Sequence, residues 1–161
     1  KIGTCVNFSE IDGMEKNSPA SEHNFDSCQL VSWNPAAWTD ENASLLKTLL
    51  EQYQITVSAF WCGWSGPAAW NFYDGPLTLG LVPVEYRQMR IENLCDGADF
   101  AHKLGITDVV THMGFIPENP YDQFQQLLIA VRTVAEHLKK NGQCLLFETG
   151  QETPVTMLRC F

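Results

Sequence analysis

The chain has 161 residues, of which 45% are hydrophobic and 18% are charged, a composition typical of one compact globular domain. Ten basic side chains against nineteen acidic ones give a net charge of −9, which repels nucleic-acid phosphates and anionic lipid surfaces. No uncharged apolar run reaches the roughly 18 residues that a membrane helix needs. The composition therefore excludes a membrane span and disfavours a nucleic-acid partner.

The cysteines indicate a reducing compartment. They are scattered singly through apolar segments, and none of them forms a CxxC pair: Cys5, Cys28, Cys62, Cys95, Cys144 and Cys160. This spacing favours buried free thiols over a secreted disulfide framework or a zinc cluster. The residues after Lys1 do not resemble a secretory signal, although an already processed chain would look the same. We therefore expect a cytoplasmic protein.

Five short apolar runs rich in β-forming residues predict strands. They cover residues 2–8, 27–33, 55–61, 106–113 and 144–147. Between the third strand and the next helix, residues 62–83 are rich in glycine and proline and predict a long irregular loop. The aromatic residues of this loop argue against disorder.

Segments with helical periodicity lie between these strands. Thr39 and Asp40 offer N-cap oxygens to a helix with an apolar stripe from residue 45 to residue 53. A second helix is expected over 84–104, with Gly97 as its least favourable position. A third begins at Asn119 and Pro120 and runs to about residue 140, and residues 153–154 cap a fourth. The alternation of strands and helices predicts a parallel sheet with right-handed crossovers.

The carboxyl ends of parallel strands are where ligands bind in α/β folds. The residues expected at these ends are polar or aromatic, and they are the candidate site residues: Asn7, Trp33 with Asn34, Trp61, His112 and Glu148. A carboxylate or imidazole here could bind a metal ion or substrate. The sequence therefore predicts a binding site at this edge of the sheet.

Glu148 is the strongest candidate, because a carboxylate directly after a buried apolar strand is costly without a partner. A bound divalent cation or substrate would offset this free-energy cost. An ion pair with a basic residue such as Lys1, or a role as a helix cap, would offset it too. His112 ends the neighbouring strand, and imidazole is the commonest metal ligand, although a lone histidine is more often a core residue. His23, His102 and His137 are expected to be solvated.

Trp33, Trp61 and Trp64 lie beside the glycine-rich loop. Core packing is the ordinary role of a buried tryptophan, but their place at strand ends favours an apolar wall against which a sugar ring could lie. The chain has no GxGxxG opening a helix, no GxxxxGK[ST] and no GxSxG motif. Phosphate cradles and a serine-based triad are therefore unsupported.

Three stretches resemble the sugar phosphate isomerase/epimerase group of xylose isomerase-like TIM barrels. They are KIGTCVNF at the start, LGITDVVTHMGFIPENP in the middle, and NGQCLLFETGQETPVTMLR near the end. The resemblance implies an α/β fold, a (β/α)8 TIM barrel, of which this chain supplies about the first five βα units. A complete barrel typically needs about 250 residues, so further ligands and a second base are expected on strands six to eight.

The resemblance implies that Glu148 is both a ligand of a catalytic divalent metal and a proton-transferring base. It places His112 in the site, binding substrate or metal. The implied reaction is proton transfer next to a carbonyl through an enediolate. Mn²⁺ or Mg²⁺ is expected, with Zn²⁺ or Co²⁺ as alternatives.

The sequence leaves three hypotheses about the function open. The first is a cytoplasmic sugar isomerase or epimerase acting on a small keto- or aldo-sugar, with no nucleic-acid or membrane partner. The second is an endonuclease-type barrel, which would want a basic groove. The third is a non-catalytic barrel remnant. An open sheet with an uncovered last strand is prone to pairing, so association with another copy to form a homo-oligomer is also expected.

Overall fold

The computed structural model describes residues 2–8 and 25–161. The strands and helices follow one another in nearly strict alternation, and their bounds are β1 Thr4–Asn7, β2 Ser27–Ser32, the 3-10 helix η2 Pro35–Ala37, α3 Asp40–Gln52, β3 Thr56–Cys62, α4 Gly75–Thr78, α5 Val84–Lys103, β4 Asp108–His112, α6 Asp122–Lys140, β5 Cys144–Glu148 and α7 Pro154–Leu158. Lys1, a possible ion-pair partner of Glu148, and His23, expected to be solvated, lie outside the described residues.

The five strands form one parallel sheet in the order β1-β2-β3-β4-β5. This confirms the predicted parallel α/β fold. In the register of the last pair, His112 lies opposite Glu148. The two strongest site candidates therefore share one level of the sheet, at the carboxyl ends of neighbouring strands.

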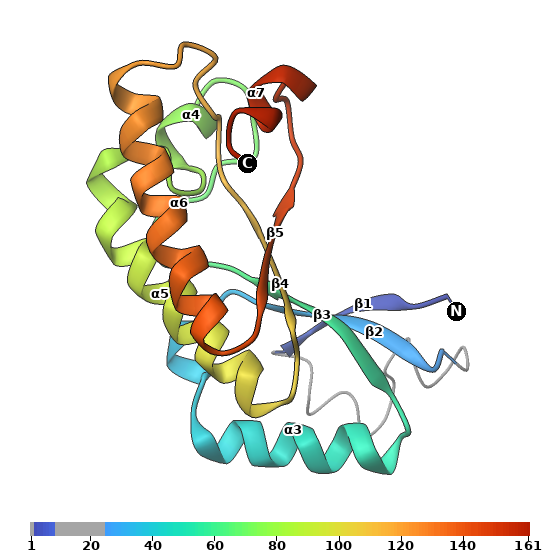
Figure 1. The fold of residues 1–161 in the computed structure, drawn as a ribbon. Coiled ribbons are helices and arrows are strands. Elements are labelled where there is room, and N and C mark those ends of the chain that lie inside the picture. The colour runs from blue at the N-terminus through green and yellow to red at the C-terminus, as the bar shows by residue number, and fades with distance from the viewer. Residues whose placement is uncertain (1, 9–24) are drawn as a thin grey trace.

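Helices α5 and α6 pack side by side against one face of the sheet (Figure 1). The core between them and the strands is built from apolar residues, which alternate with less buried ones along β2, where Cys28 and Leu30 belong to the core. In β3 all four residues 59–62 are buried. The short helices α4 and α7 gather at the end of the molecule where β5 finishes (Figure 1). That end carries the loops that could form a site.

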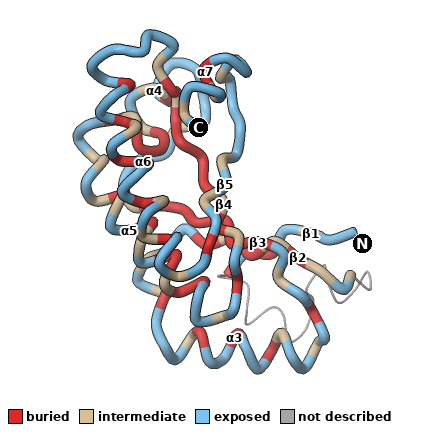
Figure 2. Tube along the Cα trace, in the orientation of Figure 1, coloured by how far each residue is buried: buried red, intermediate tan, exposed pale blue. Residues whose placement is uncertain are grey.

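The opposite face of the sheet is more open at its two edges. In β5 the residues Cys144, Leu146 and Glu148 are exposed. Residues Cys5 and Asn7 of β1 are exposed as well, and in Figure 2 the tube of β5 has no buried residue, whereas β4 contains three. The described residues supply five strands, so β1 and β5 each have a strand neighbour on one side alone, and the part of this face that is covered lies under Trp61, Trp64 and Leu79.

Some element boundaries differ from the predicted ones. Helix α6 begins at Asp122, because the Asn119 side chain accepts from the backbone N–H of Tyr121 in a local turn instead of capping the helix. The loop after β3 is ordered, as expected, but contains the short helix α4. Helix α3 starts after Thr39, whose hydroxyl accepts from Asn42 N as a capping residue should.

Gly97 fits inside helix α5 for a steric reason. A Cβ at this position would lie 2.3 Å from the Cys62 sulfur and 3.1 Å from the Trp38 ring. Glycine therefore allows close packing of α5 on β3, although its helix propensity is low.

All six cysteines are free thiols, as predicted, although Cys5 and Cys144 are exposed. Within residues 2–8 and 25–161, no helix combines the length and the apolarity that crossing a membrane requires.

Candidate active site

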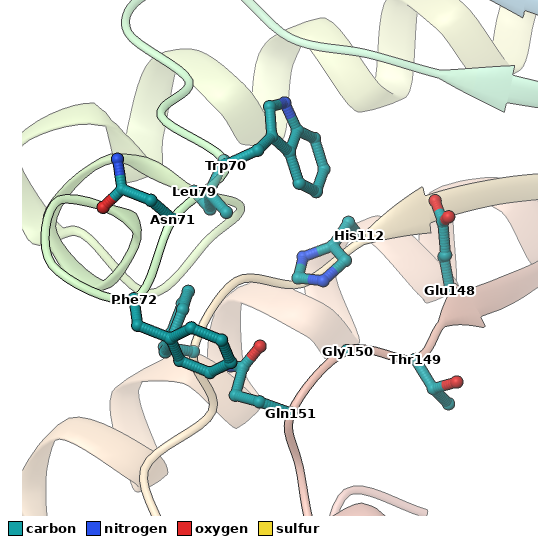
Figure 3. A pocket seen from close by; sticks show the side chains of 10 residues that line it. Trp70, Asn71, Phe72, Leu79, His112, Glu148, Thr149, Gly150 and Gln151 are labelled. Atoms are coloured by element: carbon teal, nitrogen blue, oxygen red, sulfur yellow. The ribbon is translucent and has the colours of Figure 1, made fainter.

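A pocket of about 340 Å³ opens at the carboxyl ends of β4 and β5. Its walls come from two places that are far apart in the sequence: the loop between β3 and α5, and the ends of β4 and β5 with the segment after β5 (Figure 3). The lining residues are Trp70, Asn71, Phe72, Leu79, His112, Phe115, Glu148, Thr149, Gly150 and Gln151. The volume suits a small ligand.

His112 is buried at the floor of this pocket, with 5% of its surface exposed. Its Nδ1 accepts a hydrogen bond of 3.0 Å from the backbone N–H of Gly114. In a neutral imidazole this leaves the proton on Nε2. His112 therefore presents a hydrogen-bond donor, and this tautomer favours a substrate-binding role over metal ligation through Nε2.

The charge state of His112 follows from its surroundings. Burial lowers its pKa below the ordinary value of 6.5, against the opposing effect of the Glu152 and Glu148 carboxylates. The backbone of Gly150 packs against the ring, since a Cβ there would lie 2.6 Å from Nε2. The Trp70 ring meets the imidazole edge-to-face at a centroid distance of 5.2 Å.

Glu148 lies beside His112 and is exposed at the pocket, so the predicted cost of burying its charge does not arise in this structure. Its Oε2 accepts a hydrogen bond from the indole N–H of Trp61. No other hydrogen bond or ion pair of this carboxylate occurs within the described ranges. The second carboxylate oxygen is therefore available to a ligand.

The tryptophans that were expected to form a sugar-binding wall form a cluster of their own. Trp33 contacts Trp61 and Trp64 with ring centroids 4.6 and 5.1 Å apart. Trp61 and Trp64 are buried, whereas Trp33 is 38% exposed. None of these three tryptophans lines the pocket. Trp33 does contact Trp70, however, and Trp70 is a lining residue.

Asn7 lies at the far edge of the sheet. It pairs with Val31 of β2 and is exposed, so it shares the end of the sheet with the pocket but does not line it. Among the residues expected to be solvated, His102 is exposed. His137 is only half-exposed, because its ring bonds the Asp99 carboxylate at 2.8 Å between α5 and α6.

Three residues of the site were not singled out by the sequence. Trp70 and Phe72 line the pocket from the loop after β3, and Glu152 faces His112 closely enough to influence its pKa. The Glu152 carboxylate accepts a 2.8 Å hydrogen bond from Gly150 N. The available signals were the aromatic residues of an ordered loop and a second carboxylate four positions after Glu148.

Arg90 fixes the loop that carries Trp70. Its guanidinium is completely buried and donates to the backbone carbonyls of Gly80 and Pro67 at 2.7 and 2.8 Å. The guanidinium also lies over the rings of Trp64 and Tyr86 at 5.3 and 4.9 Å. The loop is thus tied to helix α5, which positions one wall of the pocket.

The described residues fit part of a divalent metal site. Glu148 offers the carboxylate oxygen that Mn²⁺ or Mg²⁺ prefers, at the inner face where neighbouring strands of a barrel would converge. Within residues 2–8 and 25–161, however, no three His, Cys, Asp or Glu side chains gather closely enough to hold an ion. A complete site would need ligands from outside these residues.

The arrangement of an aromatic-walled pocket at the carboxyl ends of parallel strands defines an α/β barrel-type binding site. The chain belongs to the xylose isomerase-like TIM barrel family, whose model matches residues 18–161. This confirms the fold inferred from the sequence, with five strands of an incomplete barrel. A search of the curated proteins finds no match.

Solved structures support the same fold. A xylose isomerase domain protein from Planctomyces limnophilus is 24% identical, with a TM-score of 0.88 over 99% of this chain and 57% of its own. A D-allulose 3-epimerase from Methylomonas sp. is 14% identical, with a TM-score of 0.67 over 98% of this chain and 57% of its own. The chain therefore spans little more than half the length of these structures.

A third match is a xylose isomerase-like TIM barrel protein from Mycobacterium smegmatis in complex with magnesium. It is 17% identical, with a TM-score of 0.63 over 95% of this chain and 51% of its own. The matched structures include sugar epimerases and an AP endonuclease of family 2. At these sequence identities, the similarity shows the fold alone. The reaction has to be inferred from the residues of the site.

Proposed function

We propose that the full-length protein is a metal-dependent isomerase or epimerase of a sugar or sugar phosphate. The observation that carries this proposal is the pairing of Glu148 and His112 at one level of the sheet, inside a pocket with aromatic walls. A carboxylate base beside a hydrogen-bond donor is the minimum needed to move a proton next to a carbonyl. The epimerases among the matched structures support the same reading.

In the proposed mechanism, each residue has a distinct task. The free oxygen of Glu148 removes the proton from the carbon beside the carbonyl and returns it during enediolate collapse. The Nε2–H of His112 donates to a sugar oxygen and orients it. Trp70 and Phe72 offer apolar faces to the C–H groups of the sugar and exclude water from it.

A divalent cation, when bound, would polarise the carbonyl and hydroxyl oxygens of the sugar. Glu148 would hold it, together with ligands from strands beyond the described ones. Mn²⁺ or Mg²⁺ is the proposed ion, and the magnesium complex of the Mycobacterium smegmatis relative supports it.

We further propose that the protein is cytoplasmic and that its partner is a small sugar. The charge of −9 disfavours the endonuclease alternative.

The test is Glu148→Gln in the full-length protein, supplied with Mn²⁺ and a panel of ketoses and aldoses. Proton exchange with deuterated solvent next to the carbonyl should fall by about 10²- to 10⁴-fold, because the amide cannot accept the proton. NMR measures this exchange for each sugar, and titration with Mn²⁺ measures the number of ions bound.

The matched control is Glu118→Gln, since Glu118 is an exposed loop carboxylate that does not line the pocket. It should exchange and bind Mn²⁺ as the parent protein does. Undiminished exchange in the Glu148→Gln variant, with Mn²⁺ still bound stoichiometrically, would contradict the proposed role of Glu148.

A further inference from the structure

Trp61 and Glu148 are joined across the sheet. Trp61 lies on β3 and Glu148 on β5, with β4 between them. Trp61 pairs in register with Val110, whereas Glu148 pairs with His112 two residues further along β4. The indole therefore reaches diagonally over β4 so that its N–H donates to Glu148 Oε2. This contact links positions 87 residues apart.

The Trp61 ring is held firmly in that orientation. It is 7% exposed and contacts both Trp33 and Trp64, with ring centroids 4.6 and 6.0 Å away. Trp33 is itself confined, because a Cβ on Gly63 would come within 2.6 Å of its ring. A tryptophan packed in this way cannot follow a moving partner, so the partner must come to the fixed N–H group.

Glu148 is the more exposed member of the pair. Its side chain is exposed, and Oε2 receives its hydrogen bond from a donor that is neutral and cannot form an ion pair. A hydrogen bond to an ionised oxygen is stronger than one between neutral groups. Fixing Oε2 restricts rotation of the carboxylate and leaves Oε1 without a hydrogen-bond partner among the described residues.

The geometry points to Trp61 as a positioning residue for Glu148, acting through its N–H group and not as an apolar wall for the sugar. This inference rests on the proposed function of Glu148. An outer hydrogen bond that orients a carboxylate ligand typically changes metal affinity by about 10- to 100-fold when it is removed. The Trp61 N–H therefore sets how well Glu148 binds a divalent cation.

The experiment compares Trp61→Phe with Trp38→Phe in the full-length protein, using Mn²⁺ alone as the probe. Trp38 is a close match, since it is 8% exposed and its indole donates to Ser32 Oγ at 2.8 Å, but it packs on the helix side of the sheet away from Glu148. Titration calorimetry on the metal-free protein measures the affinity without any need for substrate.

We expect Trp61→Phe to weaken Mn²⁺ binding by about 10- to 100-fold, while Trp38→Phe leaves the affinity near that of the parent protein. With a sugar substrate and saturating Mn²⁺, the Trp61 variant should lose kcat more than it raises KM. Equal Mn²⁺ affinity in the parent and in Trp61→Phe would overturn the inference.

Two further variants keep the outcome interpretable. If Trp61→Phe does not fold, replacement of Trp61 by benzothienylalanine keeps the ring shape and exchanges N–H for sulfur, and it should weaken Mn²⁺ binding in the same way. If Glu148→Gln binds Mn²⁺ as tightly as the parent protein, the metal role of Glu148 fails. If Glu148→Gln loses Mn²⁺ while both Trp61 variants retain it, only the inference on Trp61 fails.

Discussion

Gly80 and Gly114 mark the place where the loop after β3 crosses the end of β4. Both have positive φ angles, +63° and +91°, and their backbones are almost in contact. A Cβ on Gly114 would lie 2.1 Å from the Leu79 carbonyl oxygen. The same glycine donates its N–H to His112, so one small residue allows the close crossing and sets the imidazole tautomer.

We predict that Gly114→Ala destabilises the protein by about 2 to 5 kcal/mol, because left-handed backbone strain adds to a steric clash with backbone. Gly105→Ala is the control, since Gly105 has a φ of +75° but no atom within 4 Å of its Cβ position. It should cost only the strain, about 1 to 2 kcal/mol. Urea unfolding measures both, and equal losses would show that the crossing is not tight.

At the scale of elements, the loop between β3 and α5 is organised by the Arg90 guanidinium, which has no acidic partner within residues 2–8 and 25–161. Arg90 contacts the carbonyls of Ser65, Pro67 and Gly80. Burial lowers its pKa to about 10, partly offset by Tyr86, so Arg90 stays protonated at neutral pH. Arg90 therefore adds its hydrogen bonds to those that the loop makes itself, such as the one from Ala69 N to Thr78 Oγ1.

We therefore predict that Arg90→Met costs on the order of 3 kcal/mol, because several buried carbonyls lose their donor. In this variant, the acceleration of amide exchange relative to the parent protein should be greater for residues 63–83 than for α6. Hydrogen exchange measures both. Arg132→Met is the control, since Arg132 is exposed on α6, and it should change stability by no more than about 0.5 kcal/mol. Unchanged exchange in the loop would refute the anchoring role.

The contrast between elements shows what the sequence can predict. Strands and long helices were predictable because apolar runs and helical stripes are local patterns, and Glu148 and His112 were found because both end such runs. The anchoring by Arg90 was not, since its partners are backbone carbonyls, which leave no signal in residue type. The contact from Trp61 to Glu148 depends on strand register across β4, which no local pattern encodes.

At the scale of the whole molecule, β1 and β5 are the edge strands of the sheet that the described residues form. The inner face of β5 exposes Leu146 to the extent of 41%, although its outer face packs on α6. The solved structures that match this fold are nearly twice as long. An open parallel edge beside an exposed apolar face is a template for pairing with another chain.

We predict that the 161-residue chain on its own associates with itself through this edge, because pairing satisfies the free backbone groups of β5 and covers Leu146 at once. Leu146→Lys should weaken the association, since a buried unpaired ammonium is costly. Ile129→Lys is the control, because Ile129 is 67% exposed on α6, away from the sheet edge. Sedimentation velocity over a wide concentration range measures the association. A chain that sediments as a monomer throughout, or an equal effect of the two lysine variants, would show that the β5 edge is not the contact.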